Sequence, residues 1–74
     1  MGLWIRTQDK KVLFNANYVA IDSTDGRIIY WERYVIATYS TDEKALKVVK
    51  MIQDLINKNE SRVFQMPEDS EVKE

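Results

Sequence analysis

The sequence predicts a small α+β domain in which one amphipathic helix packs on one face of a mostly antiparallel sheet. Only residues 39–59 repeat their apolar side chains with the period of a helix. The other apolar segments are short, rich in branched and aromatic residues, and separated by polar turn signals, which is typical of strands. Together these observations predict the element order β-β-β-β-α-β.

Residues 3–14 are expected to form either a hairpin or one strand that leads into another. Leu3 and Ile5 alternate with Trp4 and Arg6, so the two pairs lie on opposite faces of a strand. Residues 8–11 predict a polar turn before the apolar residues 12–14. Residues 18–21 then predict a further strand.

Two turns are expected to frame the next strands. Asp25 and Gly26 give the clearest turn signal, since this pair tolerates the positive φ of tight hairpins. Residues 27–31 follow as a strand, and Glu32 and Arg33 make the turn into a strand over residues 34–39. That last strand leads directly into the helix.

The helix is expected to begin at a capping box and to bury one apolar stripe. Ser40 and Glu43 have the spacing at which a side chain and the backbone cap each other. At about 100° per residue, six apolar residues fall within an arc of about 120°. They are Ala45, Val48, Val49, Ile52, Leu55 and Ile56. Asn59 can adopt the left-handed conformation that ends a helix.

The remaining residues predict one short strand and a tail. Residues 62–66 are expected to return along the sheet, and Pro67 ends this strand. Residues 1–66 therefore form a single α+β domain. Residues 67–74 contain four carboxylates and one lysine, and we expect them to be a disordered acidic tail.

Size and composition limit the class of protein. A chain of 74 residues buries only about 60% of its unfolded surface, and without cysteine it has no disulfide to add stability. Pairing with a second copy is the common alternative. The absence of cysteine favours a reducing compartment, and no apolar run approaches the roughly 18 residues of a membrane span. We therefore expect a cytoplasmic protein that does not enter a membrane.

The residue inventory argues against catalysis. The chain has no histidine and no cysteine, and its two glycines leave no phosphate-binding loop. Asp22 and Asp25 are a carboxylate pair of the kind that can bind a cation or act as acid and base, but capping of a hairpin in solvent is the favoured interpretation. The sequence thus predicts no enzyme and no catalytic, cofactor-binding or metal site.

Aromatic residues with neighbouring arginines are the candidates for a contact surface, because an aromatic side chain provides a large binding area. Leu46 and Met51 lie on opposite flanks of the helix stripe, where either widens the core contact or touches a second subunit. The candidate binding or interface residues are Trp4, Arg6, Tyr30, Trp31, Arg33, Tyr34, Leu46 and Met51.

Three strings carry a resemblance to a known group of proteins. They are WIRTQDK at residues 4–10, TYSTDEKALKV at residues 38–48 and FQMP at residues 64–67. The chain resembles small uncharacterised proteins of Gram-positive bacteria and their phages or prophages, almost over its whole length. Members often have Ser where this chain has Thr7 and Gly where it has Ala37. The resemblance implies an origin and brings no activity.

The leading hypothesis is a non-catalytic cytoplasmic protein that acts by protein contact, as a homodimer or with another protein. The alternative is a module that binds single-stranded nucleic acid by stacking bases on exposed aromatic side chains. In that alternative, the aromatic residues and arginines on the sheet that make the contact are Trp4, Arg6, Trp31, Arg33 and Tyr34.

Overall fold

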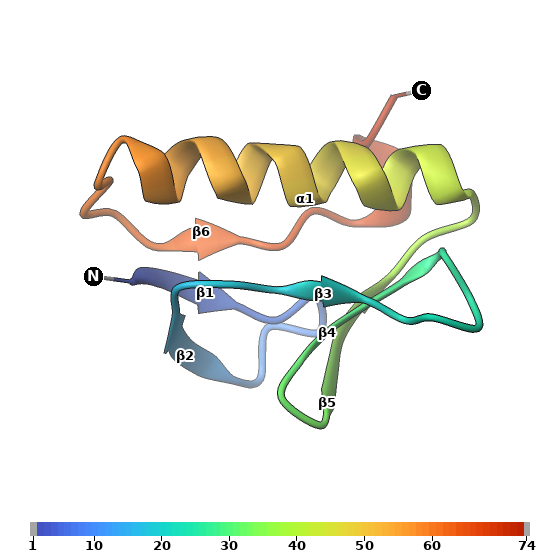
Figure 1. Cartoon of the computed structure of the whole chain (residues 1–74), viewed down its shortest axis with the longest axis horizontal. Helices are drawn as coiled ribbons and strands as arrows, with labels where there is room; N and C mark the ends of the chain where they lie inside the picture. The colour runs from blue at the N-terminus through green and yellow to red at the C-terminus, as the bar shows by residue number, and fades with distance from the viewer. Residues whose placement is uncertain (1, 74) are drawn as a thin grey trace.

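The structure is a computed structural model that describes residues 2–73 and has an α+β fold, as the sequence predicts. Five strands precede one α-helix, and a short strand and a 3₁₀ helix follow it (Figure 1). The elements are β1 (Leu3–Arg6), β2 (Leu13–Ala16), β3 (Ala20–Ile21), β4 (Ile28–Trp31), β5 (Tyr34–Thr38), α1 (Asp42–Asn57), β6 (Phe64–Gln65) and η1 (Asp69–Glu71).

The strands form two three-stranded sheets, and this differs from the single sheet that we expected. One sheet has the order β2-β1-β6, in which β6 is parallel to β1, and the other has the antiparallel order β3-β4-β5. Residues 3–14 are a hairpin, so one more strand precedes the helix than the predicted order contains.

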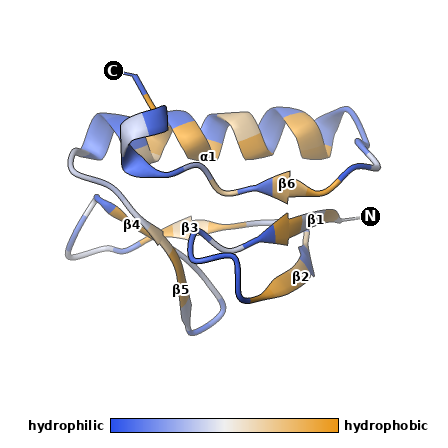
Figure 2. Cartoon of the chain, turned by 180° about the vertical axis from the view of Figure 1, so that it is seen from behind, coloured by the Kyte–Doolittle hydropathy of each residue, from blue (hydrophilic) through white to orange (hydrophobic). Residues whose placement is uncertain are grey.

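The core lies between the two sheets and the helix. β1 contributes Leu3 and Ile5, β4 contributes Ile29, and Met66 follows β6; each is fully buried. Figure 2 shows the apolar residues of α1 on the side that faces the strands. The predicted helix stripe is confirmed. Its buried members are Ala45, Val48 and Ile52, and Val49, Leu55 and Ile56 are partly buried against the same core.

The helix begins one residue later than the predicted capping box. Thr41 is the N-cap, and its Oγ1 accepts a hydrogen bond of 3.2 Å from the backbone N–H of Lys44. The prediction that Ser40 caps the helix is wrong. Its backbone N–H instead donates to Oδ1 of Asp69 at 2.7 Å, which fixes Ser40 outside the helix.

The helix ends as predicted, at a residue in the left-handed conformation. Asn59 has φ 55°. Its N–H donates to the carbonyl of Ile56 at 3.0 Å, and the N–H of Glu60 donates to the carbonyl of Leu55 at 3.1 Å. This pair of bonds is a Schellman motif, which satisfies carbonyls that have no partner inside the helix.

Gly26 lies in the turn before β4, as predicted, but without the positive φ that we expected. No glycine described in the structure has a positive φ; the residues that do are Lys10, Glu32 and Asn59. A Cβ atom built on Gly26 would lie 2.9 Å from Cγ of Asp42, the first residue of α1. The contact is with the carboxylate of an exposed side chain, so a Cβ at position 26 requires that carboxylate to rotate away.

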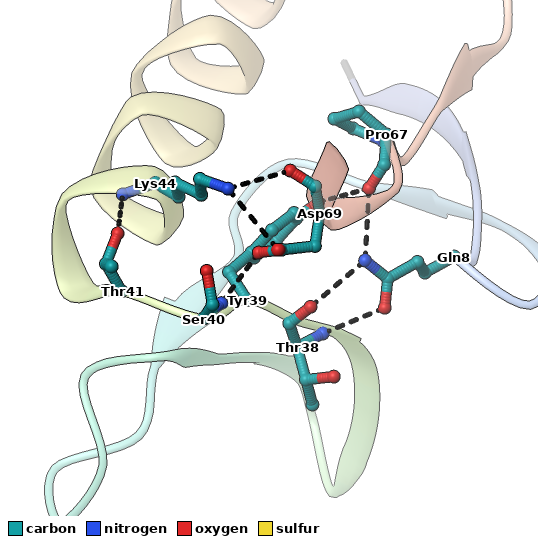
Figure 3. Close-up of polar contacts among 8 residues, drawn as sticks. All are labelled: Gln8, Thr38, Tyr39, Ser40, Thr41, Lys44, Pro67 and Asp69. Carbon is teal, nitrogen blue, oxygen red and sulfur yellow. Dashed lines mark hydrogen bonds and ion pairs between the residues drawn. The ribbon is translucent and has the colours of Figure 1, made fainter. Parts of the chain in front are cut away.

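The Gln8 side chain joins the two sheets beyond the end of β1 (Figure 3). The backbone N–H of Gln8 donates to the carbonyl of Ile36 at 2.9 Å. Its Oε1 accepts from the N–H of Thr38, and its Nε2 donates to the carbonyls of Thr38 and Pro67, each at 3.1 Å. The amide thus pairs with the outer edge of β5 as a strand backbone would.

Residues 67–73 are packed against the domain, in contrast to the disordered tail that we expected. The Tyr39 hydroxyl donates to the carbonyl of Pro67 at 2.7 Å, and Lys44 Nζ lies 3.3 Å from Oδ2 of Asp69 (Figure 3). Val72 is buried. Composition misled the prediction, because one carboxylate of the acidic segment meets a backbone donor and a lysine at the start of α1, and one valine reaches the core.

We expect Gln8→Ala to lower the free energy of unfolding by about 2 kcal/mol, since three hydrogen bonds of its side chain are lost. Urea denaturation of wild type and variant at pH 7 measures this difference.

Gln8→Glu is the sharper control, because its carboxylate would face the carbonyls of Thr38 and Pro67 without a proton to donate. We expect it to be less stable than Gln8→Ala at pH 7. The folded state would raise the pKa of this Glu, so the deficit relative to Gln8→Ala should shrink as the pH falls below about 5. An unchanged difference between the two variants at pH 4 would contradict the assigned hydrogen bonds.

Tyr39 should make the fold sensitive to alkali. Its burial, together with the charges of Asp69 and Glu71, raises the pKa of its hydroxyl. The unfolded chain loses this proton near pH 10 while the folded state retains it, so the free energy of unfolding falls above that pH by up to about 1.4 kcal/mol per pH unit.

Tyr39→Phe should therefore flatten the alkaline slope and cost about 1 kcal/mol at neutral pH through the lost bond to Pro67. Tyr34→Phe is the matched control, since the Tyr34 side chain is exposed. Urea denaturation between pH 7 and 11 measures both effects. A wild-type slope in Tyr39→Phe would show that another group is responsible.

Candidate functional site

An apolar cleft of about 370 Å³ lies between the β1–β2 hairpin and the β4–β5 hairpin. The two hairpins approach each other on the side of the strands away from α1 (Figure 1). The cleft is lined by Thr7, Asp9, Val12, Phe14, Trp31, Tyr34, Val35 and Ile36.

The floor of the cleft is an aromatic stack. Phe14 and Trp31 have ring centroids 4.6 Å apart and planes inclined by 23°. Phe14 is opposite Ile5 in the β1–β2 ladder, so it points to the buried face, and Trp31 lies two residues beyond buried Ile29 on β4. Strand alternation in both sheets therefore brings the two rings together at the edge of the core.

The rim of the cleft is formed by three exposed apolar side chains. Val12, Tyr34 and Val35 are exposed by 53%, 63% and 61%. A single exposed apolar residue needs no explanation, but a group of them around a recess is typical of a binding surface.

A β-bulge lies in the part of β5 that lines the cleft. Tyr30 pairs with Val35 while Ile29 pairs with Ala37, so Ile36 is an extra residue on β5. In a regular strand, Ile36 and Ala37 would point to opposite faces, but here both are buried. Val35 lines the cleft from its exposed rim, and Ile36 lines it from the core side.

One end of the cleft is polar and carries a negative charge. The Thr7 hydroxyl donates to Oδ1 of Asp9 at 2.6 Å, and the same oxygen accepts from the N–H of Lys11 at 3.0 Å. These hydrogen bonds lower the pKa of Asp9 and keep its carboxylate ionised, and the bond from Thr7 has the largest effect. The cleft thus combines an apolar floor and rim with a single anionic end.

Two predicted contact residues, Trp31 and Tyr34, line the cleft, and two others lie on a different surface. Trp4 and Arg6 are exposed on β1, and buried Ile5 between them points to the opposite face. The five side chains required for the nucleic-acid alternative are therefore not assembled into one stacking platform. Trp31, moreover, already stacks on Phe14.

The other predicted residues are also dispersed. Tyr30 is half-buried on β4, and Arg33 is exposed in the β4–β5 turn. Leu46 and Met51 are exposed on α1, and Met51 borders a separate recess beside β6. Neither helix residue is covered by the sheets.

Sequence reasoning missed Phe14, Val12, Val35 and Ile36 as parts of the site. Residues 12–14 are all apolar, so no alternation in the sequence shows which face of a strand Val12 and Phe14 share. Nothing in the sequence indicated the bulge in the part of β5 that adds Val35 and Ile36 to the cleft.

Asp22 and Asp25 both act as hydrogen-bond acceptors in the β3–β4 turn. Asp22 accepts from the N–H and the hydroxyl of Thr24 at 3.3 and 3.2 Å. Arg27 binds both oxygens of Asp25 at 3.0 Å and lowers its pKa. Across residues 2–73, the acidic side chains form no cluster of three or more that would suit a metal ion.

α1 is too short and too polar to span a lipid bilayer, and the same holds for every helix within residues 2–73. Comparison with protein-family models, with curated proteins and with solved structures identifies no match to the chain.

Changes at the floor and at the rim of the cleft should affect stability differently. Phe14→Leu should lower the free energy of unfolding by about 1 to 2 kcal/mol, because it removes the aromatic stack and leaves unfilled volume. Val35→Lys should change it by less than about 0.5 kcal/mol, because this side chain is mostly exposed. Urea denaturation followed by tryptophan fluorescence measures both. A large loss in Val35→Lys would mean that the rim belongs to the core.

Proposed function

We propose that the chain is a non-catalytic interaction protein that holds an apolar side chain of a protein partner in the cleft between its two hairpins. The observation that carries the proposal is the convergence of Val12, Tyr34 and Val35 around the Phe14–Trp31 stack. In a chain this small, apolar side chains are needed for the core, and these three are left at the surface beside a recess.

The energetics suit an anchor residue. Burying one Leu, Phe or Met side chain contributes about 1.5 to 3 kcal/mol. Aromatic side chains in well-packed pockets are the usual hot spots of protein interfaces, and Trp31 and Tyr34 would provide them here. The Asp9 carboxylate at one end would favour a partner with a basic residue next to its apolar anchor.

In this proposal the protein works in the cytoplasm without a cofactor, and its partner is a second copy or another protein. The absence of cysteine supports a reducing compartment. The strings at residues 4–10, 38–48 and 64–67 support an origin among small proteins of Gram-positive bacteria or their phages.

Selection from a displayed library of random peptides tests the cleft. We expect the enriched peptides to share one large apolar residue. A synthetic peptide from this group should bind at least tenfold more weakly to Val35→Lys than to wild type, because the lysine places a charge at the apolar rim.

Val63→Lys is the matched control, since Val63 is also an exposed valine and lies beside β6, away from the cleft. It should bind the peptide like wild type. Equal binding to wild type and Val35→Lys, or no enrichment of any apolar residue, would refute the proposal.

The alternative of single-stranded nucleic-acid binding makes a different prediction. It requires binding of labelled DNA or RNA at low salt and a loss of binding in Trp4→Ala, whose side chain is outside the cleft. The separation of Trp4 and Arg6 from Trp31 is the reason that we favour a protein partner.

A further inference from the structure

Two residues of β2 direct their backbone N–H and C=O groups to the free edge of the sheet. In the β1–β2 ladder, the N–H of Thr7 donates to the carbonyl of Val12, so hydrogen-bonded pairs recur at Ile5–Phe14 and Leu3–Ala16. The residues between them on β2, Leu13 and Asn15, therefore direct their N–H and C=O groups away from β1.

The opposite edge of β1 supports this assignment. Arg6 is opposite Leu13 in the ladder. The Arg6 carbonyl accepts the N–H of Met66 beside β6, so the backbone groups of Arg6 also point away from the β1–β2 ladder. β2 is the last strand of its sheet, and no other strand of residues 2–73 pairs with its outer edge.

β2 lacks the features that usually protect an edge strand. Its sequence is Leu-Phe-Asn-Ala, without lysine, proline or any charge, and its partners in the ladder show no bulge. The outer edge of β5, in contrast, is covered by the Gln8 side chain. Within the chain, the outer edge of β5 is therefore covered and the outer edge of β2 is not.

We propose that β2 pairs with β2 of a second copy across a two-fold axis at Phe14. The outward groups of Leu13 and Asn15 are placed symmetrically about Phe14. In an antiparallel pair, Leu13 of one copy therefore meets Asn15 of the other, and the reverse pair forms at the same time. Four backbone hydrogen bonds would close the two edges and make one six-stranded sheet.

The side chains of the outer face agree with a second copy as the occupant. Leu13 and Asn15 point to the exposed face, as does Trp4, which is opposite Asn15. Across the two-fold axis the two Leu13 side chains become diagonal neighbours at about 7 to 8 Å between Cα atoms, within reach of each other. A second copy provides the backbone groups and the apolar partner of Leu13 at the same time.

The proposal deepens the protein-contact function proposed above and rests on it, but it concerns a different surface. The edge uses the backbone of Leu13 and Asn15, whereas the cleft uses the side chains of Val12, Tyr34 and Val35. Val35→Lys tests the cleft and Leu13→Lys tests the edge, so a result can refute one proposal without refuting the other.

Sedimentation equilibrium across a range of protein concentrations tests the pair. We expect wild type to approach twice the chain mass of 8.7 kDa. Leu13→Lys should weaken dimerisation at least tenfold, because it replaces the apolar pair with two like charges. Leu46→Lys is the matched control, since Leu46 is exposed by 52% and Leu13 by 49%. It should dimerise like wild type.

Asn15→Pro tests the backbone contribution, because proline removes the outward N–H while the ladder to β1 keeps its own bonds. It should also be monomeric, and circular dichroism checks its fold. If that variant does not fold, amide hydrogen exchange provides the same information: the Leu13 and Asn15 amides should be protected in wild type and exposed in Leu13→Lys.

Three results would overturn the proposal. They are a mass of one chain at all concentrations up to the millimolar range, an undiminished dimer in Leu13→Lys, and an equal loss in Leu46→Lys. The last two would place the interface elsewhere on the molecule.

Discussion

The Gln8 side-chain amide is the link on which the arrangement of the two sheets depends. It meets both backbone groups of Thr38 and the carbonyl of Pro67, and its own N–H donates to Ile36 (Figure 3). The end of β1, the outer edge of β5 and the beginning of the C-terminal segment therefore meet at one residue. An amide that both donates and accepts can do this, because β5 offers an N–H and a C=O at the same position.

The same link shapes the cleft. Ile36 is the extra residue of the β5 bulge, its carbonyl accepts the Gln8 N–H, and it is one of the residues that line the cleft. The bulge thus provides both the attachment point between the sheets and one wall of the recess. Since Thr7, next to Gln8, lies at the polar end of the recess, the geometry of the candidate site follows from how the sheets are joined.

Local patterns predicted the parts of the fold that local forces determine. The helix stripe and the left-handed Asn59 were predicted because periodicity and a C-terminal stop signal are visible in neighbouring residues. The division into two sheets was missed because it depends on Gln8 and Thr38, which are 30 residues apart. Of the cleft, Trp31 and Tyr34 were predicted as contact residues, but their partners on β2 and the bulge on β5 depend on tertiary pairing.

β2 connects the two proposals because strand alternation gives its residues different tasks. The Phe14 side chain points to the core and forms the floor of the cleft. The side chains of Leu13 and Asn15 point to the opposite face, and the backbone groups of these two residues lie along the free edge. In the proposed pair, the two Phe14 residues meet at the two-fold axis, so both clefts open on the same side of the six-stranded sheet. A partner with two apolar anchors would then bind the second one intramolecularly, and the gain in affinity would require no contact beyond those of each cleft.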